Sequence, residues 1–118
     1  MSCLFNSLSY FIHLPSFEIR QKICDYLTEN KPIIEGIETR EILELEGGFD
    51  RYIRDMRSMH TWGGAIEIQV ACNIWNTKIH VKCLRANENS IIEFIPIVGT
   101  AETEYTLEWT GGHYEPMR

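Results

Sequence analysis

Residues 65–84, AIEIQVACNIWNTKIHVKCL, change their apolar period halfway along one continuous segment. The first eleven residues, 65–75, begin with the alternation of apolar and polar residues that is typical of a strand, but the segment is longer than a typical strand. The same residues also carry two apolar stripes at helical spacing: Ile68, Ala71, Cys72 and Trp75, and Ile66, Val70 and Ile74. This length and double stripe favour a helix that is buried on most sides. The next residues alternate at Ile79, Val81 and Cys83, which predicts that a strand follows.

Helical patterns dominate before this segment, and strand patterns dominate after it. We predict helices over residues 3–12, over 16–29 with Ser16 as the N-cap, and from residue 49 in FDRYIRDMRSM. The acidic residues 31–48 are predicted to form short helical pieces or a mobile arm that ends at a double glycine. Three strands of one sheet are expected from KIHVKCL, SIIEFIPI and EYTLEW. Helices first and a small sheet last indicate an α+β or three-layer arrangement, in which a small central sheet is flanked by helices, with residues 1–118 as a single domain.

Composition and charge narrow the class of function. The 118 residues are 44% hydrophobic and 24% charged, which is typical of a globular domain. A net charge of −6 opposes binding to phosphate backbones, so nucleic acid is not an expected partner. The uncharged start of the chain lacks the basic region and cleavage site of a secretory signal, and no apolar run approaches the roughly 20 residues of a membrane span. Four widely spaced cysteines are predicted to be free thiols in the cytoplasm.

Cys3 is the strongest candidate nucleophile, because it lies at the start of a predicted helix. Unpaired N–H groups and the helix dipole favour a thiolate at such a position. Near the other end of the chain, His113 follows two glycines and a strand, and Glu115 lies two residues further on. If a strand resumes there, period 2 puts both side chains on one face, where Glu115 can orient the imidazole and His113 can serve as a base.

The other cysteines and histidines have simpler interpretations. His80 and Cys83 have a metal-like spacing, but residues i and i+3 of a strand point to opposite faces, so neither a metal site nor any other cofactor is expected. Cys24 and Cys72 lie on apolar helical segments and are predicted to be core residues. The remaining histidines are expected to be surface or capping residues.

Three blocks of the sequence, taken in order, resemble the ovarian tumour (OTU) family of cysteine proteases. SCLFNSLSY resembles its nucleophile segment, TWGGAIEIQVACNIWNTKIHV its central Trp-Gly, helix and strand, and GGHYEPM its terminal histidine block. The resemblance implies the OTU α+β fold, no cofactor, and cleavage of ubiquitin or polyubiquitin, with ubiquitin-like modifiers as further substrates in some viral members. It also implies that Cys3 is the nucleophile, His113 the base and Glu115 the orienting residue. Trp62, Gly63 and Gly64 are implied to form a structural junction.

One departure from the family pattern leaves two functions open. The family motif has Asp-Gly before the residue that precedes the cysteine, and its loop helps to bind the oxyanion; here Met1 stands at the glycine position. The first hypothesis is therefore an OTU-like deubiquitinase, and the alternative is a catalytically impaired module that binds ubiquitin or regulates a partner. A third reading is an unrelated domain with chance matches. In either OTU reading, specificity is expected in residues 31–48, where Glu41 and Glu44 are predicted to contact ubiquitin.

Overall fold

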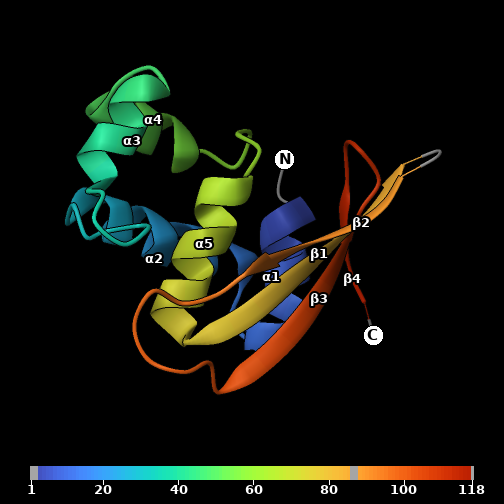
Figure 1. Cartoon of the computed structure of the whole chain (residues 1–118). Helices are drawn as coiled ribbons and strands as arrows, with labels where there is room; N and C mark the ends of the chain where they lie inside the picture. The colour runs from blue at the N-terminus through green and yellow to red at the C-terminus, as the bar shows by residue number, and fades with distance from the viewer. Residues whose placement is uncertain (1–2, 86–87, 118) are drawn as a thin grey trace.

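The computed structural model describes residues 3–85 and 88–117, which form helices in the first part and a sheet in the second (Figure 1). The helices are α1 (Cys3–Ile12), α2 (Ser16–Thr28), α3 (Thr39–Leu45), α4 (Phe49–Met56) and α5 (Ala65–Trp75). The strands are β1 (Thr77–Arg85), β2 (Glu88–Phe94), β3 (Thr103–Trp109) and β4 (Tyr114–Pro116). The predicted α+β arrangement is confirmed.

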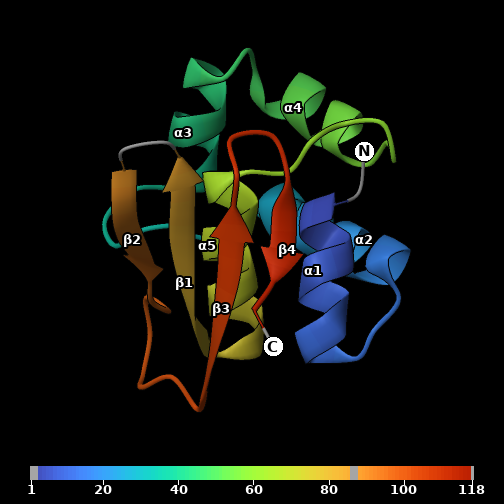
Figure 2. The same cartoon turned by 90° about the vertical axis from the view of Figure 1, so that its right-hand side faces the viewer.

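The four strands form one mixed sheet in the order β2-β1-β3-β4. β1 pairs with β2 in antiparallel and with β3 in parallel orientation, and the short strand β4 pairs with β3 in antiparallel orientation at the edge. Figure 2 shows the helices behind the sheet, with α1 beside β4 and α5 behind β1 and β3. Within residues 3–85 and 88–117 no helix covers the face toward the viewer, so the helices lie on one side of the sheet and the expected three-layer alternative is not formed. We call the face toward the helices the inner face and the other the outer face.

The core lies between the inner face and the helices, and α5 is its central helix. Ile68, Val70, Ala71 and Cys72 of α5 are buried, which confirms the helical interpretation of this segment. Alternate residues of β1, namely Ile79, Val81 and Cys83, are buried on the inner face as their period predicts.

The predicted helices form, but α2 ends at Thr28 instead of residue 29, α4 ends at Met56 within the predicted stretch of residues 49–59, and the predicted start of α2 differs. Ser16 is the first residue of α2 and Pro15 is its N-cap, so the prediction of Ser16 as N-cap was wrong. Proline is well suited to a helix start, because its fixed φ angle is compatible with the helix and its missing N–H is not needed there. The Ser16 hydroxyl donates instead to the side-chain oxygen of Asn6 on α1.

The segment of residues 31–48 contains one regular helix, α3, so its helical interpretation is confirmed. Gly47 and Gly48 follow with φ angles of 107° and 116°, a backbone conformation that favours glycine, and the chain then enters α4. The guanidinium of Arg40 lies 4.1 Å from the centroid of the Phe49 ring, which joins α3 to α4.

Candidate active site

Cys3 is the first residue of α1, and its half-buried side chain belongs to the helix face that meets the sheet. Two residues further along α1 identify that face. Ser7 hydrogen-bonds the backbone of β4, and the ring of Phe11 stacks on Tyr105 of β3 with centroids 4.5 Å apart. Residues four apart lie above one another on a helix, so Cys3 occupies the same face one turn before Ser7.

The histidine block forms the hairpin between β3 and β4. Its turn is closed by the backbone N–H of Thr110, which donates to the carbonyl of His113 at 3.1 Å. A strand does resume here, but it begins at Tyr114, one residue after His113. The Nε2 atom of His113 lies 2.6 Å from a carboxylate oxygen of Glu115, so the two side chains come together. Because Glu115 occupies Nε2, the other ring nitrogen, Nδ1, is available for proton transfer.

The start of α1, the start of β4 and the segment before α5 lie at the same end of the molecule (Figure 2). Tyr114, the residue after His113, bridges the first two of these elements. Burial raises the pKa of the Tyr114 hydroxyl, and negative charge on Cys3 raises it further, so Tyr114 is within electrostatic reach of the thiol. The fold thus gathers the three sequence blocks around the start of α1.

Gly63 is the contact between the Trp-Gly-Gly junction and α1. A Cβ atom at this position would lie 2.7 Å from Cδ2 of Leu4 and 3.0 Å from the Phe5 ring, so only glycine allows this approach. Both neighbours are buried, and Leu4 directly follows Cys3. The junction therefore packs directly against the first turn of α1.

Two buried charged residues lie in this region, Glu67 against the junction and Arg20 against α1, and sequence reasoning missed both. Glu67, which is 1% exposed, accepts hydrogen bonds from the Gly64 N–H at 2.8 Å and from the Tyr52 hydroxyl at 2.7 Å. Arg20 is equally buried, donates to the Met56 carbonyl at 2.8 Å and lies over the Phe5 ring. Burial raises the pKa of Glu67 and lowers that of Arg20, and the attraction between them opposes both shifts.

One sequence signal does point to Glu67. It is the third residue of α5 after Gly64, the position from which a glutamate side chain reaches back to the N-cap backbone N–H. No comparable local signal exists for Arg20, because its acceptor Met56 lies 36 residues away.

An apolar pocket of about 200 Å³ lies on the inner face beside this end of the sheet. Tyr114 and Trp109 form one wall, and Ala65, which follows the junction, forms another. The remaining lining residues are Val81, Cys83, Ile92 and Phe94. The pocket holds no charged side chain, so it suits an aliphatic group.

The structure places the other sequence candidates elsewhere. Burial raises the pKa of both Cys24 and Cys72 to about 12, as expected for inert core thiols. His80 lies on β1 near Glu93 and Glu104, and it alternates with residues buried on the inner face, so it lies on the outer face. Within residues 3–85 and 88–117, no group of three or more metal-binding side chains is positioned to hold an ion.

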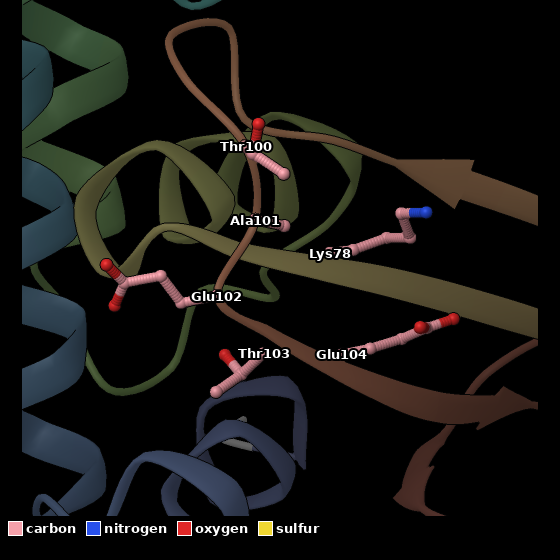
Figure 3. A pocket seen from close by; sticks show the side chains of 6 residues that line it. All are labelled: Lys78, Thr100, Ala101, Glu102, Thr103 and Glu104. Carbon is pink, nitrogen blue, oxygen red and sulfur yellow. The ribbon is translucent and has the colours of Figure 1, made fainter.

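A second cavity lies at the opposite end of the sheet, where β1 and β3 begin (Figure 3). It is lined by Lys78 and by residues 100–104, whose side chains are small or charged. β3 runs from this end toward Trp109, which pairs with Tyr114. This cavity is therefore separated from Cys3 and His113 by the length of the sheet.

Comparison with known proteins identifies the family. The sequence profile of the OTU-like cysteine proteases matches residues 2–114, and the chain therefore belongs to this family. It is 31% identical over 126 residues to an OVARIAN TUMOR DOMAIN-containing deubiquitinating enzyme 4 of Arabidopsis thaliana. That alignment covers 98% of the chain but only 39% of the plant protein.

Solved structures show the same fold at lower sequence identity. The viral OTU protease of Dera Ghazi Khan virus matches with a TM-score of 0.73 and 21% identity, covering 99% of this chain and 76% of the viral one. An OTU domain in complex with ubiquitin matches with a TM-score of 0.74 and 21% identity, covering 98% and 62%. An OTU deubiquitinase from Wolbachia pipientis bound to ubiquitin matches with a TM-score of 0.66 and 18% identity, covering 99% and 89%.

No helix in the described ranges, 3–85 and 88–117, is long and apolar enough to cross a membrane.

Proposed function

We propose that this chain is a cysteine isopeptidase that removes ubiquitin from lysine side chains or from other ubiquitins, with residues 1–118 as a single OTU domain. The observation that carries the proposal is the pairing of His113, which directly precedes β4, with Glu115 of β4, the strand that lies beside the helix of Cys3. Family membership and the ubiquitin-bound relatives support ubiquitin as the substrate.

The proposed reaction uses Cys3 as nucleophile and His113 as acid and base. The Cys3 thiolate attacks the carbonyl carbon of the C-terminal glycine of ubiquitin, and the C–N bond to the lysine amine breaks as His113 protonates that amine. The product is a thioester on Cys3. Water then attacks the thioester carbonyl while His113 takes a proton from the water, and the C–S bond breaks, which releases ubiquitin with a free C-terminal carboxyl group and regenerates the Cys3 thiolate beside the imidazolium.

Glu115 and the helix start support these steps. The carboxylate of Glu115 holds Nε2 of the imidazole, which turns Nδ1 toward the reacting groups and stabilises the imidazolium. The first N–H groups of any α-helix have no intrahelical acceptor, so the first turn of α1 offers donors to the developing oxyanion. The apolar pocket beside Tyr114 would receive an aliphatic side chain from the acyl side of the substrate.

The state of the cysteines supports a reducing compartment. All four are free in the structure, and Cys24, Cys72 and Cys83 are buried in the core. A catalytic thiol must also stay reduced to act. We therefore place the protein in the cytoplasm.

The test is to incubate the chain with ubiquitin that carries a C-terminal electrophile and to locate the adduct by mass spectrometry. We expect one adduct on Cys3, none in Cys3→Ala and a much slower reaction in His113→Ala. A folded protein that forms no adduct would contradict the isopeptidase proposal. Ubiquitin binding by that unreactive protein would instead support a binding module.

A further inference from the structure

Ser7 is a buried polar residue that contacts the backbone of both reactive segments. It is only 2% exposed. Its hydroxyl oxygen lies 2.8 Å from the carbonyl oxygen of Cys3 and 3.1 Å from that of Tyr114, and it donates its single proton to these two acceptors. Cys3 is the proposed nucleophile, and Tyr114 directly follows the proposed base.

The bond to Cys3 is local, whereas the bond to Tyr114 spans 107 residues of sequence. A serine in a helix often hydrogen-bonds the carbonyl four residues earlier, so the bond to Cys3 alone does not connect α1 to another element of the fold. The second bond crosses from α1 to the edge strand of the sheet and fixes the relative position of the two segments.

The hydrogen-bond pattern of the hairpin shows why the carbonyl of Tyr114 is available to Ser7. Thr110 and His113 form a hydrogen-bonded pair at the turn, so the next pair, Trp109 and Tyr114, is of the non-hydrogen-bonded type. The N–H and C=O groups of Tyr114 therefore point away from β3. β4 is the edge of the sheet that the described residues form, so no further strand among them receives that carbonyl, and Ser7 donates to it instead.

We propose that Ser7 is a positioning residue that sets the distance between the Cys3 thiol and the His113 imidazole. The inference rests on the proposed function. The far end of α1 is fixed separately by the stack of Phe11 on Tyr105, so the Ser7 bond acts at the end of α1 that carries Cys3. β4 has only three residues, and a strand this short depends on such added contacts to hold His113 in place.

The test compares Ser7→Ala with Ser9→Ala, a variant with the same chemical change on the same helix. The Ser9 hydroxyl donates to the Leu14 carbonyl, in the turn after α1, and not to the sheet. We expect Ser7→Ala to lower kcat for ubiquitin release about tenfold with KM unchanged, because the loss concerns the reacting groups and not the bound ubiquitin. We expect Ser9→Ala to keep the wild-type kcat.

A second readout separates positioning from stability. The rate at which iodoacetamide alkylates Cys3 is measured from pH 5 to 9, below the unfolding temperature of each variant. If Ser7 positions Cys3 beside His113, its loss moves the pH profile of alkylation toward that of His113→Ala, whereas a merely destabilised protein keeps the wild-type profile. Mass spectrometry resolves the sites, and Cys24 and Cys72, with pKa values of about 12, serve as internal controls that stay unlabelled.

Ser7→Thr retains the hydroxyl and is expected to restore most of the kcat. If Ser7→Ala fails to fold, Ser7→Cys replaces it, because a thiol fills the same space but is a weak donor. Wild-type kcat and alkylation profile in a folded Ser7→Ala would overturn the inference and leave the isopeptidase proposal intact. An unreactive Cys3 in the wild-type protein would instead overturn the isopeptidase proposal, and with it the role of Ser7.

Discussion

Two histidines of this chain lie close to glutamates, and they differ in what surrounds them. His80 lies on the central strand β1 between Glu93 and Glu104, and His113 lies at the β3–β4 hairpin beside Glu115. His80 has more carboxylates and a less exposed side chain, 20% against 53%. However, His80 is on the outer face, which no helix of the described residues covers (Figure 2), whereas His113 directly precedes β4, the strand that is hydrogen-bonded to α1. We therefore treat a histidine–carboxylate pair as a candidate site only where the fold also places a candidate nucleophile, here Cys3, at the same end of the molecule.

The largest difference between the pairs is expected when each histidine is removed. His113→Ala should lower kcat/KM for ubiquitin release by about 10²- to 10⁴-fold, because it removes the proposed proton-transfer group. His80→Ala should change kcat/KM less than about twofold, since a surface substitution far from the site has little effect. Both are measured with ubiquitin bearing a C-terminal fluorophore. Equal losses in the two variants would show that the pairs are not distinguished as proposed.

The two junction glycines test the same comparison of the two histidines. Gly63 packs against the start of α1, at the end of the molecule that holds the proposed His113 site. Gly63→Ala should lower the free energy of unfolding by about 1–3 kcal/mol, since the new methyl group overlaps buried Leu4 and Phe5. Gly64→Ala meets no atom within 4 Å and is the matched control, with a smaller expected loss. Chemical denaturation gives both values.

An NMR spectrum of Gly63→Ala adds a spatial check. The imidazole signals of His113 should shift, because α1 is displaced beside it, while those of His80 should not. A larger loss of stability in Gly64→Ala than in Gly63→Ala would refute the packing argument.

Replacing the glutamates should also distinguish the two pairs, but with a smaller change in kcat than replacing the histidines. Glu115→Gln is expected to lower kcat about tenfold, which corresponds to the loss of roughly 1.4 kcal/mol of interaction with the imidazolium. The factor is modest because both partners are more than half exposed and water screens the pair. Glu104→Gln, next to His80, should leave kcat unchanged. A wild-type kcat in Glu115→Gln would remove Glu115 from its proposed role.

Sequence reasoning was most successful where a local period determines the outcome. The stripes of α1 and α5 and the alternation of β1 are properties of neighbouring residues, and so is the shared face of His113 and Glu115. It failed where the outcome depends on partners far along the chain. The bond from Ser7 to Tyr114 and the buried Arg20 depend on how α1 and α2 pack, which no local pattern contains. The same limit explains the second pair, because His80 meets Glu104 only through the parallel pairing of β1 with β3.

The smallest effect is expected on α3, away from both histidines. Glu41 and Glu44 are exposed on this helix, in the segment predicted to hold specificity. Replacing both with Lys should weaken ubiquitin binding by about threefold to tenfold, since each exposed charge contact contributes roughly 0.2–1 kcal/mol. The affinity is measured by titration calorimetry on the Cys3→Ala variant, which lacks the proposed nucleophile. Because screened contacts weaken with salt, the difference between the variants should shrink at high ionic strength. An unchanged affinity at low salt would exclude these two residues of α3 from the ubiquitin interface, while the comparison of the two histidines would stand.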